Sequence, residues 1–197
     1  MIRLLLIATL GLLVLMAYQR PQPSAPAPGV VAEHTPQQQR LSDGQSFRHQ
    51  GFSVTPLETF DIHARVLARR DYRHDTEAAI SPMDLALGWG PMSDSAVLQH
   101  FKIRQSNRWY YWRTKASPIP LHQVALNSAN MHMVPASPDI AKTLRNIRKD
   151  DFIRLSGHLI AVERDDGWRW VSSRSRSDTG AGSCELIWVQ NIAIEPR

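Results

Sequence analysis

The chain has almost no cysteine: among its 197 residues, Cys184 is the only one. No internal disulfide can form, so a small secreted fold stapled by disulfides is excluded. The chain also lacks any Asn-x-Ser/Thr acceptor for N-glycosylation. Both absences fit an exported bacterial protein better than a eukaryotic secreted one.

Dense runs of charge are missing as well. The chain is 43% hydrophobic and 21% charged with a net charge of +5, which is ordinary globular composition. The longest basic clusters are Arg69-Arg70 and the pair Arg174 and Arg176. A nucleic-acid-binding domain would carry a denser basic stripe, so we expect no nucleic-acid partner. Weak attraction to anionic lipid or cell-wall polymers stays open beside plain surface solvation.

One long uncharged run stands at the start of the chain, over residues 4–18. A spanning helix needs roughly 17–25 apolar residues and a signal-peptide core about 7–15, so this run lies at the border. No small-x-small cleavage site follows it directly, and Ala25-Pro-Ala27 lies well downstream before another proline. We therefore predict an uncleaved signal anchor over residues 1–20, in contact with the membrane through residues 2–18. A cleaved signal and a buried N-terminal helix are the alternatives.

The charges at the two ends of this run predict its orientation only weakly. Arg3 and the amino terminus stand on one side and Arg20 on the other. A short N-terminal tail before a large domain favours an inner or plasma membrane protein that crosses once, with its domain facing the periplasm or the exterior.

Residues 21–46 are rich in Pro, Gln, Ala and Ser and show no hydrophobic periodicity. This composition is typical of a linker, part polyproline II and part coil. Residues 47–197 are then long enough for one globular domain with its own core.

Apolar alternation and capping signals predict the first elements of that domain. Residues 60–69 alternate as a half-buried strand, and residues 108–113 are aromatic enough to be another. Helices are expected to begin at Ser81, Ser93 and Ser137, each with a serine N-cap, followed twice by proline. After Pro118 and Pro120 a strand is expected over residues 122–126.

The last fifty residues read as an antiparallel β unit. A long strand covers Phe152–Glu163, where Gly157 predicts a bend or bulge of the kind that barrels need. Asp165-Asp-Gly167 predicts a hairpin turn, and a central strand is expected over residues 184–189. Together these elements predict an α+β domain with an antiparallel, partly closed, barrel-like sheet, OB-like or SH3-like, and about three short helices.

Three stretches carry a resemblance: residues 85–94 (Leu-Ala-Leu-Gly-Trp-Gly-Pro-Met-Ser-Asp), residues 128–136 (Ser-Ala-Asn-Met-His-Met-Val-Pro-Ala) and residues 178–185 (Asp-Thr-Gly-Ala-Gly-Ser-Cys-Glu). With them the chain resembles an uncharacterised group of short bacterial proteins with an N-terminal apolar segment, over about residues 60–190. The resemblance implies an exported bacterial protein and carries no activity.

Cys184 is the first candidate for catalysis. It follows the flexible stretch Gly180-Ala-Gly-Ser183, whose amides could form an oxyanion site. His132 could act as the base and Asn130 as its orienter, as in Cys-His-Asn enzymes. The Thr-Leu-x-Thr-Cys signature of sortases and the Ser-His-Gly-Cys of L,D-transpeptidases are both absent. The alternative is that Cys184 packs as a small apolar residue at the start of a strand.

Three tryptophans are candidates for ligand binding. Trp89 is flanked by glycines, and Trp109 and Trp112 belong to a run of four aromatics that could offer a platform to a sugar, peptide or nucleobase. Burial in the core is the alternative for each of them. His122, His132 and His158 lack metal-ligand spacing, so we expect no metal and no cofactor.

These observations favour a membrane-anchored cell-envelope protein that acts as a binding or assembly module for an unknown ligand, with an envelope protein or the cell wall as a possible partner. The alternative is an envelope enzyme that performs acyl transfer or hydrolysis with Cys184 and His132. Whether the chain is an enzyme stays open at this stage, with a non-enzymatic role favoured.

Overall fold

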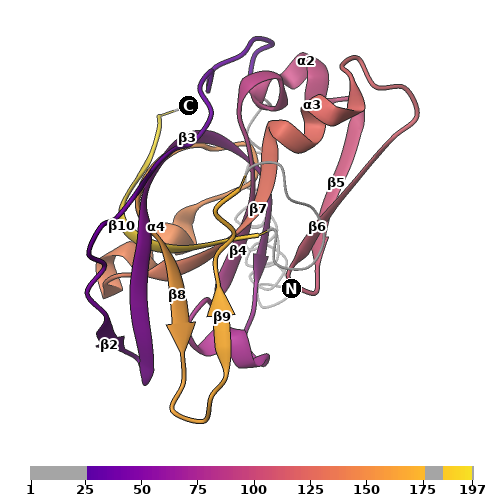
Figure 1. Cartoon of the computed structure of the whole chain (residues 1–197). Helices are drawn as coiled ribbons and strands as arrows, with labels where there is room; N and C mark the ends of the chain where they lie inside the picture. Colours follow the sequence, from indigo (N-terminus) through magenta and orange to yellow (C-terminus); the bar gives the residue numbers. More distant parts are fainter. Residues whose placement is uncertain (1–25, 176–183, 197) are drawn as a thin grey trace, which may run out of the picture.

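The computed structural model describes residues 26–175 and 184–196, so the predicted anchor lies outside its described part. Within that part the chain is mostly sheet with three short α-helices (Figure 1), which confirms the α+β class. None of the helices described there is long and apolar enough to cross a membrane.

Short helices and 3₁₀ turns interrupt the strands along the chain. The strands are β1 (Gln37–Arg40), β2 (Phe47–His49), β3 (Phe52–Asp71), β4 (Met83–Gly88), β5 (Phe101–Ser106), β6 (Trp109–Thr114), β7 (Ser128–Pro135), β8 (Phe152–Glu163), β9 (Arg169–Val171) and β10 (Glu185–Ile194). The helices are η1 (Thr76–Ala79), η2 (Gly90–Ser93), α2 (Ser95–Leu98), α3 (Leu121–Leu126) and α4 (Pro138–Asn146).

The main sheet curls into a ring. Its strands follow the order β1-β3-β4-β7-β10-β8-β9, and β3 pairs with β8 as well. This pairing closes β3, β4, β7, β10 and β8 into a ring of five strands, and β1 and β9 lie outside the ring. β7 and β10 run parallel, and the other neighbours in the ring are antiparallel. β5 and β6 form a separate hairpin, inserted in the sequence between β4 and β7.

Strand alternation decides which side chains fill the ring. On β4, Met83, Leu85 and Leu87 point inward, and Asp84 and Ala86 point outward. The inward side chains of the five ring strands make the largest core cluster, including Phe60, Ile62, Val66, Met131, Met133, Leu155, Leu159, Ile187 and Val189.

Much of the outer face of the ring is also covered. The β5–β6 hairpin packs Tyr110 and Trp112 over Leu67 and Ala86. A second outer cluster, around Ile160, Val162, Leu186 and Trp188, lies under the aromatic residues of β2 and β9. The outward side chains of β4 and β7 are therefore buried, although they point away from the ring's interior.

The irregularity predicted at Gly157 lies on the partner strand, because β10 carries a bulge opposite this glycine. A Cβ at this position would lie 1.9 Å from the carbonyl oxygen of Trp188 on β10. The β8–β10 register shifts at the same place, between Val189 and Asn191. Only a residue without a side chain allows β10 to approach so closely.

The helix expected after Ser81 is instead strand β4. The Ser81 hydroxyl donates to the carbonyl oxygen of Met133 at 3.1 Å, so it joins the loop to β7 and caps no helix. The prediction is wrong because Ser81-Pro82 and the acidic Asp84 fit a first helical turn, whereas Asp84 is the polar position of the alternating strand β4.

The strand expected over residues 122–126 is also wrong. This segment is the helix α3, which begins directly after Pro120. Proline at the helix start costs no hydrogen bond, and Val124 is the one residue of the turn that is fully buried. The helix expected at Ser137 is confirmed as α4, and the Ser137 hydroxyl accepts from the Ile140 amide. The helix expected at Ser93 begins two residues later as α2, and its N-cap is Asp94 rather than Ser93.

The described part of the predicted linker lies against the domain. Ala32 is buried in the core, and Gln37–Arg40 forms β1, which pairs with residues 58–61 of β3. β1 is nearly all polar and exposed, which explains why no hydrophobic periodicity marks it in the sequence.

The close approach at Gly157 makes a prediction about stability. We expect Gly157→Ala to lower the free energy of unfolding by about 1–3 kcal/mol, because the new Cβ meets a backbone oxygen that cannot rotate away. Arg154→Ala, an exposed position on the same strand, should change it by no more than about 0.5 kcal/mol. Urea denaturation of the two variants tests this, and equal effects would contradict the role given to Gly157.

Candidate functional site

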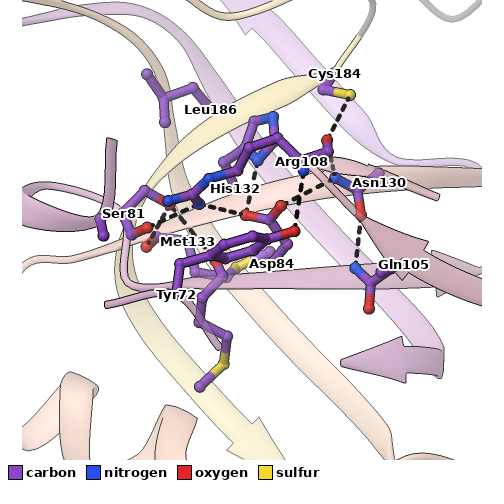
Figure 2. A network of polar contacts seen from close by, with 12 residues as sticks. Tyr72, Ser81, Asp84, Gln105, Arg108, Asn130, His132, Met133, Cys184 and Leu186 are labelled. Carbon is purple, nitrogen blue, oxygen red and sulfur yellow. Dashed lines mark hydrogen bonds and ion pairs between the residues drawn. The ribbon is translucent and has the colours of Figure 1, made fainter. Parts of the chain in front are cut away.

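A network of charged and polar side chains lies on the outer face of β4 and β7 (Figure 2). Its centre is Asp84, which is 0% exposed. Asp84 on β4 stands directly opposite His132 on β7, and the next outward pair is Ala86 opposite Asn130. The antiparallel register therefore brings Asp84, His132 and Asn130 onto one patch of the surface beneath the β5–β6 hairpin.

The Asp84 carboxylate has three partners. Its Oδ1 accepts from Nη1 of Arg108 at 2.9 Å and lies 2.8 Å from Nδ1 of His132. Its Oδ2 accepts from Nδ2 of Asn130 at 3.4 Å. A buried carboxylate without such partners would carry a large desolvation penalty, so these contacts are what allows Asp84 to be buried.

Arg108 reaches the network from the tip of the hairpin. Ser106 pairs with Trp109, which leaves Asn107 and Arg108 as a two-residue loop, and both have positive φ (52° and 66°). This pattern is that of a type I′ turn, whose second position usually holds glycine. A large side chain there costs about 1–2 kcal/mol of backbone strain. This strained turn places the guanidinium of Arg108 next to the Asp84 carboxylate.

The guanidinium of Arg108 contacts two carboxylates and two aromatic rings. Besides Asp84, it donates to both oxygens of Asp75 (2.6 and 3.0 Å) and to the carbonyl oxygen of Ser81 (2.9 Å). Its carbon lies 3.7 Å from the ring centroid of Tyr72 and 5.8 Å from that of Trp170. Arg108 thus ties the hairpin to the β3–β4 loop and to β9.

His132 has the geometry of an oriented base. A carboxylate can only accept, so the ring nitrogen that faces Asp84, Nδ1, carries the hydrogen and Nε2 is left as the acceptor in the neutral ring. The centroid of the His132 imidazole lies 4.6 Å from the centroid of the Trp170 ring system. An aspartate that fixes a histidine tautomer in this way is the supporting half of a catalytic triad.

Electrostatic shifts follow from these contacts. Burial alone would raise the pKa of Asp75, but its hydrogen bonds and ion pair with Arg108 outweigh this and lower it. Burial likewise opposes the charge on Arg108, and Asp75 and Asp84 reverse the effect and raise its pKa. The pKa of Tyr72 is raised, first by burial and then by the negative charge of Asp84.

The three residues predicted as catalytic lie close together, with different partners. The Asn130 amide donates to the carbonyl oxygen of Arg108 at 2.9 Å, and Sγ of Cys184 lies 3.9 Å from the same oxygen. His132 is directed at Asp84, and the residue that β10 sets beside it is Leu186. Cys184 and Asn130 therefore meet at the hairpin backbone, and His132 meets the aspartate.

The three predicted ligand-binding tryptophans lie elsewhere. Trp89 is 1% exposed and packs in the core of the ring. Trp112 packs under the hairpin against Phe101, with ring centroids 5.9 Å apart. Trp109 is half-buried at the hairpin turn, and the exposed aromatic of the run is Tyr111, which lies against Arg104.

Sequence reasoning missed Asp84, Arg108, Tyr72 and Asp75 as members of a site. Two signals were present in the sequence. Asp84 interrupts an apolar run that alternates as a strand, and Asn107-Arg108 stands where a hairpin would carry Asn-Gly. The ion pair between Asp84 and Arg108 depends on how the hairpin folds over the sheet, and local sequence patterns do not reveal this.

Comparisons with known proteins add no relative: no protein-family model, no curated protein and no solved structure matches this chain. The chemistry of the site therefore has to be argued from its own geometry.

The Arg108–Asp84 pair makes a stability prediction. We expect Arg108→Ala to lower the free energy of unfolding by about 3–5 kcal/mol, because it leaves the Asp84 charge buried without its cation. Arg108→Gly loses the same pair but relieves the positive-φ strain, so it should cost about 1 kcal/mol less. Urea denaturation followed by tryptophan fluorescence measures both.

Arg113→Ala is the matched control, because Arg113 is an exposed arginine of the same hairpin. We expect it to change stability by no more than about 0.5 kcal/mol. If Arg108→Ala costs no more than Arg113→Ala, the guanidinium does not neutralise Asp84.

Proposed function

We propose that the chain is a membrane-anchored protein of the bacterial cell envelope that works as a binding or assembly module. Residues 1–20 would anchor it, with the folded domain on the periplasmic or outer side. The uncharged run over residues 4–18 and the absence of any other cysteine or glycosylation acceptor support this address.

The strand order of the ring supports an OB-type barrel rather than an SH3-like one. Five strands close in the spatial order β3-β4-β7-β10-β8. Counted along the chain, the third (β7) and the fifth (β10) run parallel, and α4 lies between the third (β7) and the fourth (β8). OB-type barrels bind oligosaccharides and oligonucleotides on the face of their second and third strands and on the adjoining loops. Here those strands are β4 and β7.

The convergence of the network on this face supports the proposal most directly. Asp84 and His132 project from β4 and β7. Asp75 comes from the loop between β3 and β4, and Trp170 comes from β9, which precedes β10. Arg108, Tyr72 and Trp170 form a partly exposed rim over the buried carboxylate. Aromatic faces beside charged hydrogen-bonding groups suit a sugar ring, so cell-wall glycan is the ligand class we favour.

An envelope enzyme is the second candidate, and the His132–Asp84 pair favours it. A histidine held by a buried aspartate needs only a nucleophile and an oxyanion site to perform acyl transfer. Cys184 lies on the same outer face, but its sulfur is directed at the Arg108 carbonyl oxygen. A carbonyl oxygen accepts from a thiol and repels a thiolate, so this contact favours the unreactive form.

Pelleting with purified peptidoglycan sacculi tests the binding proposal. We expect the full chain in mild detergent to pellet with sacculi, and Trp170→Ala to weaken the apparent affinity by roughly tenfold, as expected for the loss of about 1.4 kcal/mol from one stacking contact. Tyr111→Ala is the matched control because Tyr111 is an exposed aromatic away from the rim. Failure of the wild type to pellet, or an equal loss in both variants, would contradict glycan binding at this site.

The rate of Cys184 alkylation separates the two candidates. We expect iodoacetamide to label the native chain no faster than the chain in urea, and His132→Gln to leave the rate unchanged, since the sulfur faces a carbonyl oxygen. Native labelling that is faster than unfolded labelling and that slows in His132→Gln would instead establish a thiol activated by the histidine and favour the enzyme.

A further inference from the structure

Acidic residues are absent from a long central stretch of the chain. No Asp or Glu occurs from residue 95 to residue 138, whereas five Lys or Arg residues do. One of them, Arg108, turns inward to the network. The others lie on the exposed face of the β5–β6 hairpin or just beyond it: Lys102, Arg104, Arg113 and Lys115. The hairpin therefore presents a surface of one sign.

The basic side chains gather at the base of the hairpin, away from its Arg108 tip. An open pocket of 590 Å³ is lined there by His100, Lys102, Arg113 and Lys115, together with Gln99 and Thr114. Lys102 and Arg113 stand directly opposite each other across the two strands. Like charges in this position destabilise a hairpin. Among the described residues, His100, Lys102, Arg113 and Lys115 form no ion pair. A bound anion would therefore relieve the repulsion between Lys102 and Arg113.

Exposed apolar side chains border the same end of the domain. The most exposed large apolar residues include Val30, Val31, Leu121 and Leu126. The Val31 amide donates to Oγ of Ser93, which ends η2. Leu126 is the last residue of α3. The carbonyl oxygen of Asn127, which follows it, accepts from the amide of Trp89, which directly precedes η2. Figure 1 shows α2 and α3 together at this end, where β5 begins.

The chain also enters the domain here. The carbonyl oxygen of Pro26 accepts from Oγ of Ser95, the first residue of α2, at 2.6 Å. Eight peptide steps separate Tyr18, the end of the apolar run, from Pro26. A fully extended chain of that length spans at most about 29 Å. If residues 2–18 lie in a membrane, α2 and the base of the hairpin stay within roughly 30 Å of its surface.

We propose that this end of the domain docks on an anionic membrane surface, with phospholipid phosphates held at the basic pocket and the four apolar side chains in contact with the interface. The inference rests on the proposed anchoring. Basic residues beside exposed apolar ones, next to a membrane segment, are the pattern of anionic-lipid recognition. The apolar border and the short tether favour lipid over nucleic acid, which would need neither.

Lysine labelling of the full chain in lipid nanodiscs tests the docking. One set of discs is phosphatidylcholine alone, and the other contains about one third phosphatidylglycerol. We expect acetylation of Lys102 and Lys115 by an N-hydroxysuccinimide ester to slow roughly threefold or more in the anionic discs. Lys142, exposed on α4 on another side of the ring (Figure 1), is the internal control and should label equally in both. About 0.5 M NaCl, where the Debye length falls to roughly 4 Å, should restore much of the rate.

Paired variants locate the effect. Lys102→Gln/Arg113→Gln should abolish the slowing at Lys115, whereas Lys142→Gln/Arg145→Gln should leave it intact, because Lys142 and Arg145 lie on α4. Both pairs remove two exposed positive charges, so a general charge effect would act equally on them. Equal slowing in the two double variants would overturn the assignment to the hairpin base.

The remaining outcomes separate docking from anchoring. A chain that co-elutes with both kinds of disc, but whose Lys102 and Lys115 label equally in them, keeps its anchor and overturns the docking. A chain that elutes without the discs overturns the anchoring, and the docking with it. Protection of the same lysines by a single-stranded oligonucleotide in phosphatidylcholine discs, without protection by phosphatidylglycerol, would identify a nucleic-acid surface and overturn the lipid assignment.

Discussion

The carboxylate of Asp84 has no contact with solvent, and a buried charge must be neutralised by its surroundings. β4 cannot supply the partner, because strand alternation directs its neighbouring side chains into the ring. The partners come from elsewhere: His132 and Asn130 from the adjacent strand and Arg108 from the tip of the hairpin. The position of the hairpin, the conformation of its turn and the closure of the β3–β4 loop over Arg108 all contribute to balancing this one charge.

A buried ion pair of this kind contributes specificity more readily than stability, since desolvation cancels much of the attraction. Here its role in specificity is visible. The apolar contacts of Tyr110 and Trp112 would hold the hairpin against the ring in several nearby positions, because apolar contacts are non-directional. The guanidinium donates to Asp75, Asp84 and the Ser81 carbonyl oxygen, and these directional bonds select one position. The hydrogen bonds of Gln105 to Asn130 and of Tyr110 to Ser128 favour the same one. The strained turn at Arg108 is the local cost of this selection.

The sequence was informative where one local rule decided the outcome. The long strand β8 and the capped helix α4 follow from alternation and from Ser137-Pro138, and both are present. The irregularity expected at Gly157 lies opposite that glycine, on β10. The sequence misled where two rules competed. Ser81-Pro82 satisfies a helix start, yet the alternation of β4 and the need to fill the ring prevailed. Only part of the site could be predicted. His132 and Asn130 are residue types typical of catalytic sites, whereas Asp84 and Arg108 belong to the site only because two distant segments come into contact.

The β5–β6 hairpin links the proposed ligand face to the proposed docking surface. Its tip carries Arg108 into the network, and its base carries Lys102 and Arg113 into the basic pocket. Six cross-strand pairs connect the two ends in continuous register, so the hairpin is expected to tilt as one body rather than to bend. If lipid holds the base, the angle at which the tip covers Asp84 and His132 is set by the membrane as well as by the ion pair. Access to the ligand face and attachment to the bilayer would then be coupled through one pair of strands, without any further moving part.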